Sequence, residues 1–147
     1  MYDNILVPLD GSKRAEAILP HVESIASARG SKVHLLTTVL YRISVDAEGI
    51  RSFINEGDFQ RRMQEAKSYL ENLESEIRAK DIEVESSVEV GPPVEIIIKK
   101  AEDIGSNLIA IASHGRGGVG RVFYGSVAAG LLQAIDRPLL LIRSREH

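Results

Sequence analysis

Apolar residues occur along the chain in short, nearly continuous runs that are separated by longer segments with a helical period. The continuous runs are "NILVPLD" (4–10), "KVHLLTTVL" (32–40), "NLIAIA" (107–112) and "PLLLIR" (138–143). Such runs are typical of strands that are buried on both faces of a parallel sheet. The segment "IEVESSVEV" (82–90) alternates apolar and polar residues instead. It is therefore expected to be a strand with one solvent-exposed face, near an edge of the sheet.

Helical spacing predicts a helix after the first strand and a long helix after the second. Ser12 is suited to cap the first helix and Gly30 to end it, and Pro20 is expected to kink its axis. Apolar residues at alternating intervals of three and four from Phe59 onward predict the long amphipathic helix. Residues Tyr41 to Gly57 show no sustained period, so they are predicted to form a loop with room for one helical turn.

Two further helices are predicted in the second half of the chain. Pro92 and Pro93 are suited to begin the first of them, which ends near Gly105, and "VAAGLLQAI" (127–135) forms the second. Strand therefore alternates with helix five times, which predicts an α/β fold whose parallel sheet carries helices on both faces. The 147 residues contain no internal repeat or linker, and we expect one domain that spans residues 1–147.

The composition narrows the possible partners and compartments. The net charge of -3 gives no general attraction for nucleic acid or for an anionic membrane. Absence of cysteine excludes disulfides and thiolate metal sites, and the N-terminus lacks the pattern of a secretory signal. No apolar run approaches the roughly 20 residues that a membrane-spanning helix needs. We expect a cytoplasmic protein.

The glycine-rich segment "SHGRGGVGRVFYGS" (113–126) fits two phosphate-binding templates only superficially. Its G-x-G-x-x-G follows the fourth predicted strand, near the C-terminus, which leaves no room for the second half of a dinucleotide-binding fold. A P-loop needs Lys and Ser or Thr after its last glycine, but Arg121 and Val122 stand there. Gly125 and Ser126 instead open a helix, whose free N–H groups at Ser126, Val127 and Ala128 form an anion site.

The chain resembles the universal stress protein family over essentially its full length. The resemblance rests on "ILVPLDGS", "GPPVEIIIKKAE", "ASHGRGG" and "GSVAAGLLQAIDRPLLLIR", which occur in that family's order. The family's nucleotide-binding branch carries G-x2-G-x9-G-[S/T], which Gly115, Gly125 and Ser126 match here. Ala112 replaces the first glycine of this motif. The resemblance implies a Rossmann-like open sheet of five parallel strands in the order 3-2-1-4-5.

The resemblance also implies an adenine nucleotide ligand, ATP in the first place. The implied contacts lie at the carboxyl ends of strands one, two and four, with Asp10 near the ribose or a bound magnesium ion and Thr38 offering backbone to adenine. The phosphates would meet the start of the last helix. The full set of implied nucleotide contacts is Pro8, Leu9, Asp10, Thr38, Ile111, Ala112, His114, Gly115, Arg116, Gly125, Ser126, Val127 and Ala128.

Simpler interpretations remain open for several of these residues. Asp10, in Asp-Gly-Ser before a helix, is explained equally well by a turn. His114 has no second His, Asp or Glu at the spacing of a metal site, and loop arginines such as Arg116 are commonly just solvated. If Ala112 needs a positive φ angle, or if the ligand packs against its Cα atom, nucleotide affinity falls.

Three functions are compatible with the sequence. The first is an ATP-binding regulatory module of the stress response, with an unknown protein partner. The second is slow ATP hydrolysis at the same site, and the third is a dimeric interaction protein that has lost nucleotide binding. The last strand would be an exposed apolar edge, and pairing it with a second copy would cover it. We therefore expect a homodimer, as in the family, through Leu139, Leu140, Leu141 and Ile142.

Overall fold

A computed structural model of the chain describes residues 1–40, 43–45, 51–53, 56–114 and 125–144. Its main sheet has five parallel strands in the order β5-β2-β1-β6-β7. Counted along the chain within this sheet, the order is 3-2-1-4-5, as predicted. The five strands are β1 (Asn4–Pro8), β2 (Lys32–Val39), β5 (Glu83–Val90), β6 (Leu108–His114) and β7 (Leu139–Ser144).

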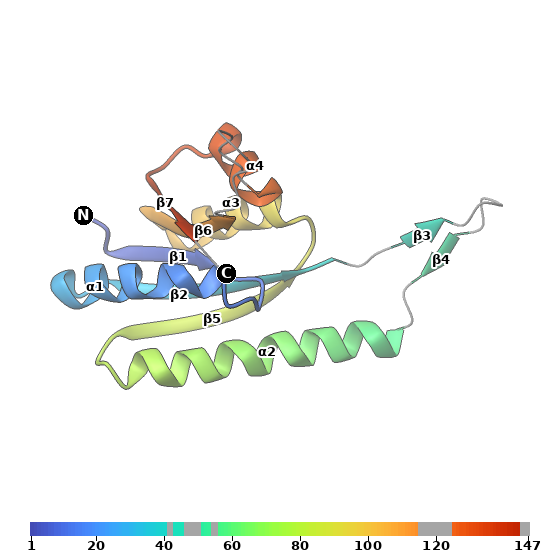
Figure 1. The fold of residues 1–147 in the computed structure, drawn as a ribbon, viewed down its shortest axis with the longest axis horizontal. Helices are drawn as coiled ribbons and strands as arrows, with labels where there is room; N and C mark the ends of the chain where they lie inside the picture. Colours follow the sequence, from blue (N-terminus) through green and yellow to red (C-terminus); the bar gives the residue numbers. More distant parts are fainter. Residues whose placement is uncertain (41–42, 46–50, 54–55, 115–124, 145–147) are drawn as a thin grey trace.

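Helices cover both faces of this sheet (Figure 1). They are η1 (Ala15–Ile18), α1 (Leu19–Arg29), α2 (Glu56–Arg78), α3 (Pro93–Ile104) and α4 (Ser126–Ala134). One core cluster joins α1 and α2 to one face, and a second joins α3 and α4 to the other. Successive strand residues supply the two clusters in turn, as Ile5 and Val7 enter the first and Leu6 enters the second. The predicted α/β fold with helices on both faces is confirmed.

The two edges of the sheet differ in chemistry. At one edge, β5 has its buried residues on the α2 side and the acidic residues Glu83, Glu85 and Glu89 on the other side. Its predicted place near an edge is confirmed. At the other edge, β7 presents Leu139 to Ile142, which are only partly buried in the single chain. The apolar edge is therefore the one at which a second copy was expected.

The prediction of a kink at Pro20 is wrong. Residues Ala15 to Ile18 form a 3-10 turn, and the α-helix begins only at Leu19, so Pro20 stands in the first turn. A proline is accommodated there because its missing N–H would have no partner within the helix. Ser12 does cap the segment, since its hydroxyl accepts a hydrogen bond from the N–H of Ala15 at 3.1 Å.

The prediction of a loop for residues 41–57 is also wrong at the residues of this segment that the structure describes. A small antiparallel hairpin pairs β3 (Ile43–Val45) with β4 (Arg51–Phe53), and α2 already begins at Glu56. Three-residue strands are too short to give a recognisable alternation. Figure 1 shows this hairpin projecting from the sheet near the start of α2. Over the described residues, none of the helices combines the length and the apolar character required to span a membrane.

Candidate functional site

A pocket of about 320 Å³ lies where the carboxyl ends of β1, β2 and β6 meet the start of α4. In an open parallel sheet this is the edge at which ligands bind. Of the residues named from the sequence, the structure brings ten together in its lining: Pro8, Leu9, Asp10, Thr38, Ile111, Ala112, Gly125, Ser126, Val127 and Ala128.

The first turn of α4 supplies the most distinctive side of the pocket. The first hydrogen bond within the helix runs from the N–H of Ala129 to the Gly125 carbonyl at 3.0 Å. The preceding N–H groups of Ser126, Val127 and Ala128 therefore have no partner within the helix. No side chain among the described residues forms a capping hydrogen bond at Gly125. These donors, with the positive end of the helix dipole behind them, make this side of the pocket suited to an anion.

Asp10 also lines the pocket and forms the predicted turn. Its Oδ1 accepts hydrogen bonds from the Ser12 N–H at 2.9 Å and the Ser12 hydroxyl at 2.6 Å, and its Oδ2 lies 3.4 Å from Arg14. Burial alone would raise the pKa of this carboxyl, but the Ser12 hydrogen bonds and the Arg14 charge outweigh it and lower the pKa. Asp10 is therefore a carboxylate at neutral pH and presents a fixed negative charge to the pocket.

Backbone contacts hold the strand end that precedes Asp10. The N–H of Leu9 donates to the carbonyl of Leu36 at 2.8 Å, and the hydroxyl of Thr37 donates to the carbonyl of Leu9 at 3.0 Å. Thr38 follows on β2 and lines the pocket. Both strand ends are therefore fixed relative to each other, which sets the position of the Asp10 turn.

Ala112 has an ordinary strand backbone. Among the described residues other than glycine, positive φ angles occur at Tyr2 and Asp81, so Ala112 does not need the conformational freedom of glycine. Its side chain packs against the core cluster beneath α1 and also borders the pocket. Replacement of glycine by alanine at this position therefore causes no backbone strain. Whether the ligand packs against the Cα atom is a separate question.

Three residues named from the sequence cannot be placed at the pocket. Gly115 and Arg116 lie outside the described residues, as does the rest of the glycine-rich segment to residue 124. His114 ends β6, where its Cα atom is paired with that of Ser144, but its side chain is not described.

Sequence reasoning missed six residues that also line the pocket. Arg14 follows Asp10 by four positions, and its guanidinium lies 3.4 Å from the Asp10 carboxylate. The others depend on how α3 and the neighbouring strands pack, which no local pattern reveals. The missed residues are Arg14, Ala15, Leu36, Pro93, Ile97 and Ser113.

A second pocket, of about 450 Å³, adjoins the first through Asp10, Thr38 and Pro93. It lies on the α2 side, where Tyr69 donates a hydrogen bond from its hydroxyl to Glu16 at 3.0 Å. Burial and the neighbouring Glu16 raise the pKa of the Tyr69 phenol, so it stays protonated at neutral pH. Within the part of the chain that the structure describes, no three His, Asp or Glu side chains cluster closely enough to hold a metal ion.

The sheet order and this site define a Rossmann-like α/β protein. The model of the universal stress protein family matches residues 1–143, and the chain therefore belongs to the universal stress protein family. Universal stress protein MJ0577 from Methanocaldococcus jannaschii is 27% identical over 157 residues, covering 99% of this chain and 97% of that protein.

Solved structures share the fold over nearly the whole chain. The structure of MJ0577 gives a TM-score of 0.80 at 30% identity and covers 100% of this chain and 99% of its own. The universal stress protein from Archaeoglobus fulgidus, solved in complex with dAMP, gives 0.68 at 24% identity, covering 96% and 98%. A universal stress protein solved in complex with cAMP gives 0.68 at 18% identity, covering 96% of each chain.

Proposed function

We propose that the chain, as a single domain, binds an adenine nucleotide in the pocket at the start of α4, with ATP as the leading ligand. The observation that carries this proposal is that the first turn of α4, which has no side-chain cap among the described residues, and the Asp10 turn line the same pocket. Such a pocket combines an anion site with a carboxylate that accepts hydroxyl hydrogen bonds, which are the two needs of a ribose phosphate.

Each side of the pocket is suited to one part of the nucleotide, and we propose the following contacts. The N–H groups of Ser126, Val127 and Ala128 bind the phosphates, and Asp10 binds the ribose. The apolar side chains of Ile97 and Ile111 lie beside Thr38 in the lining and provide the surface for the adenine ring. If a magnesium ion accompanies the nucleotide phosphates, Asp10 would be its protein ligand instead of a ribose contact.

Two neighbours in fold support the class of ligand. The Archaeoglobus fulgidus protein was solved with dAMP and another family member with cAMP, both adenine mononucleotides. In this chain the nucleotide is the regulatory signal of a stress-response module, since the site lacks the P-loop lysine that fast phosphoryl transfer uses.

Calorimetric titration with ATP, ADP and AMP, each with and without magnesium, tests the proposal directly. We expect saturable binding with one nucleotide per chain and the highest affinity for ATP. Mass and absorbance of the purified protein show whether a nucleotide is retained from the cell. Absence of binding for all three nucleotides contradicts the proposal, and steady phosphate release reassigns the site to slow ATP hydrolysis.

The variant Gly125→Val tests the position of the phosphates. A valine side chain next to the first turn of α4 blocks the approach of phosphate to the free N–H groups. We expect the Kd for ATP to rise roughly 30-fold or more, equivalent to about 2 kcal/mol. Ala134→Val, at an exposed position near the end of the same helix, is the matched control and should bind normally. Unchanged affinity in Gly125→Val refutes the site assignment.

We also propose that the protein functions as a homodimer through the outer edge of β7, from Leu139 to Ile142. A free strand edge bearing partly buried apolar side chains is suited to pair with its own two-fold copy. Nucleotide binding at the neighbouring β6 end then changes the surface that a partner protein meets.

A further inference from the structure

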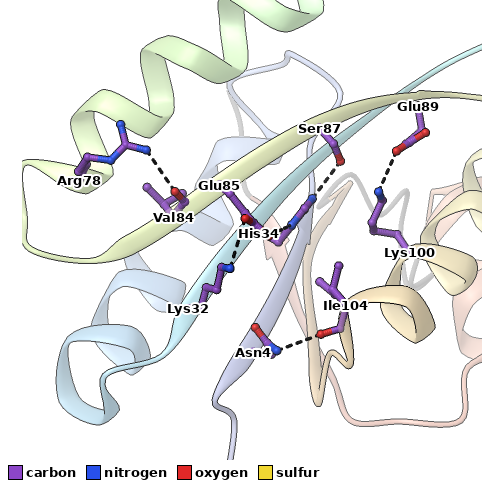
Figure 2. A network of polar contacts seen from close by, with 10 residues as sticks. All are labelled: Asn4, Lys32, His34, Arg78, Val84, Glu85, Ser87, Glu89, Lys100 and Ile104. Atoms are coloured by element: carbon purple, nitrogen blue, oxygen red, sulfur yellow. Dashed lines mark hydrogen bonds and ion pairs between the residues drawn. The ribbon is translucent and has the colours of Figure 1, made fainter.

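A carboxylate, an imidazole and a hydroxyl form a continuous chain of hydrogen bonds between β2 and the edge strand β5. The register of these strands places His34 directly opposite Glu85. The Nδ1 atom of His34 lies 3.0 Å from Glu85 Oε1, and its Nε2 atom lies 2.9 Å from the Ser87 hydroxyl. Figure 2 shows the imidazole between these two side chains. The cluster shares no residue with the pocket at the start of α4.

The chemistry of the partners fixes the direction of each hydrogen bond. An ionised carboxylate only accepts, so Nδ1 of His34 carries the proton that it shares with Glu85. In a neutral ring the other nitrogen, Nε2, is then an acceptor, and the Ser87 hydroxyl donates to it. The result is a nucleophile hydrogen-bonded to a base that a third group orients.

The surroundings keep the imidazole neutral and the carboxylate ionised. Burial lowers the pKa of His34, whose side chain is 9% exposed; Glu85 acts against this shift, whereas Lys100 and Lys32 act with it. The hydrogen bond from His34 and the ammonium of Lys32, 3.2 Å away, lower the pKa of Glu85. His34 is therefore in its basic form at pH 7, as a general base must be.

We propose that Ser87 is an activated serine nucleophile that accepts acyl groups from small activated esters. The relay from Glu85 through His34 to Ser87 supplies the base and its orientation. The ammonium of Lys100 supplies positive charge on the same face of the sheet. It is 2.8 Å from Glu89, two residues beyond Ser87 on the same strand, and acts electrostatically on His34. We expect this positive charge to favour the oxyanion that forms during acyl transfer.

Each atom of the acyl transfer is accounted for. The Ser87 oxygen attacks the ester carbonyl carbon, its proton passes to Nε2 of His34, and the carbonyl electron pair moves onto the carbonyl oxygen. The intermediate collapses, the bond to the leaving alkoxide breaks, and His34 returns the proton to give an alcohol and acyl-Ser87. Water then attacks the acyl group, with His34 again taking and returning one proton, and the carboxylic acid leaves.

Ser86 provides a matched internal comparison. Its side chain points to the α2 face, because its neighbours Val84 and Val88 pack into the core cluster on that side. Ser86 lines a groove of about 430 Å³ between α2 and β5, whereas the Ser87 hydroxyl is on the opposite face of the sheet, beside His34. Both residues are partly buried, so their exposure is comparable. Only Ser87 of the two has a hydrogen bond to the imidazole among the described contacts.

A fluorophosphonate probe and p-nitrophenyl acetate test the proposal on the full-length protein. We expect the probe to label Ser87, identified by peptide mass spectrometry, and the ester to give an acyl adduct on the same residue. The rate constant of labelling should fall only as pH is lowered below the ordinary imidazole pKa of 6.5, because burial lowers the pKa of His34 and protonated His34 cannot take the serine proton.

Variants distinguish labelling that depends on activation of Ser87 by His34 from labelling that depends only on the exposure of the serine. We expect Ser87→Ala to abolish labelling and His34→Gln to slow it roughly 100-fold or more. Glu85→Gln should slow it about tenfold or more by favouring the wrong tautomer. Ser86→Ala should label like the wild type, and Lys100→Met, which keeps the apolar stem, should slow ester acylation. Since Glu85 is at the surface, with 48% of its side chain exposed, its variant should fold as the wild type does.

Two outcomes overturn the proposal. One is labelling at Ser87 no faster than at Ser86, and the other is a labelling rate that Glu85→Gln and His34→Gln leave unchanged in folded protein. Neither depends on nucleotide binding, so this inference and the proposed function succeed or fail separately.

Discussion

At residue 112 an alanine stands where the nucleotide-binding motif has glycine, and the structure removes the backbone reason for a loss of affinity. The backbone there is an ordinary strand, and the side chain packs on the core cluster beneath α1. We expect Ala112→Gly to change the Kd for ATP by less than about threefold, a difference below 1 kcal/mol. The same change should lower the free energy of unfolding by roughly 0.5–1 kcal/mol, because glycine loses more conformational entropy on folding.

Isothermal titration and urea denaturation of Ala112→Gly check both expectations. A gain in ATP affinity of more than about tenfold, or 1.4 kcal/mol, would mean that the methyl group obstructs the nucleotide. That result would also imply that the chain is weakened in nucleotide binding relative to proteins that carry the motif glycine.

Single residues were predictable from the sequence where their chemistry is local. The Asp10 turn with Ser12 involves neighbours two positions apart, and the hydrogen bonds that residue types alone suggested are present. His34 and Glu85 are 51 positions apart, and their contact depends on the pairing register of β2 and β5. No periodicity within either strand specifies that register, so the relay could not be predicted.

At the scale of elements, the close contact between α3 and α4 sets the position of the first turn of α4. A methyl group added at Gly130 would lie 2.6 Å from Val94 Cγ2, so only glycine lets the helices approach this closely. Overpacking of this kind costs about 1–3 kcal/mol, and the better helix propensity of alanine returns up to about 1 kcal/mol. We expect Gly130→Ala to lower the free energy of unfolding by about 1 kcal/mol in urea denaturation.

The double variant Val94→Ala/Gly130→Ala is the control for this contact. Removing the valine methyl groups makes room for the new one, so the double variant should be more stable than the sum of the two single changes predicts. The expected coupling is about 1 kcal/mol, which is well above the usual deviation for independent sites. Additive effects would show that Val94 and Gly130 do not limit the helix approach.

Elements were predictable where a periodic pattern extends over enough residues. The 23 residues of α2 and the continuous apolar strands gave clear signals, whereas the three-residue strands β3 and β4 gave none. The predicted kink at Pro20 is absent because a 3-10 turn precedes α1. The α-helix therefore begins at Leu19, and Pro20 lies in its first turn. The 3-10 turn buries Ala15 and Ile18 and packs against β6 and β7, which no local sequence pattern reveals.

For the whole molecule, alternation of strands and helices predicted a parallel sheet, but the strand order came from the resemblance to a family. The same apolar runs are compatible with several orders, since each buried strand has two hydrophobic faces wherever it lies in the interior. Edge strands are the exception, because one of their faces is exposed to solvent and carries polar or charged residues in alternation with apolar ones. The alternating Glu83, Glu85 and Glu89 of β5 mark one edge of the sheet.

This difference between the edges argues that β7, not β5, pairs with a second copy. Two β5 edges brought together would oppose rows of glutamates, and like charges facing each other across strands are destabilising. Two β7 edges would instead bring together Leu139 to Ile142. We therefore expect light scattering to give the mass of a dimer at micromolar concentration.

Substitutions at the two edges distinguish this interface from any other. Leu141→Lys places an ammonium group at the β7 edge, and the two-fold axis brings two such charges together, so the dissociation constant should rise at least tenfold, about 1.4 kcal/mol. Val90→Lys, at an exposed position that ends β5, is the matched control and should leave the dimer intact. Thermal denaturation must show that both variants are folded. A monomeric wild type, or a dimer that Val90→Lys disrupts and Leu141→Lys does not, places the interface elsewhere.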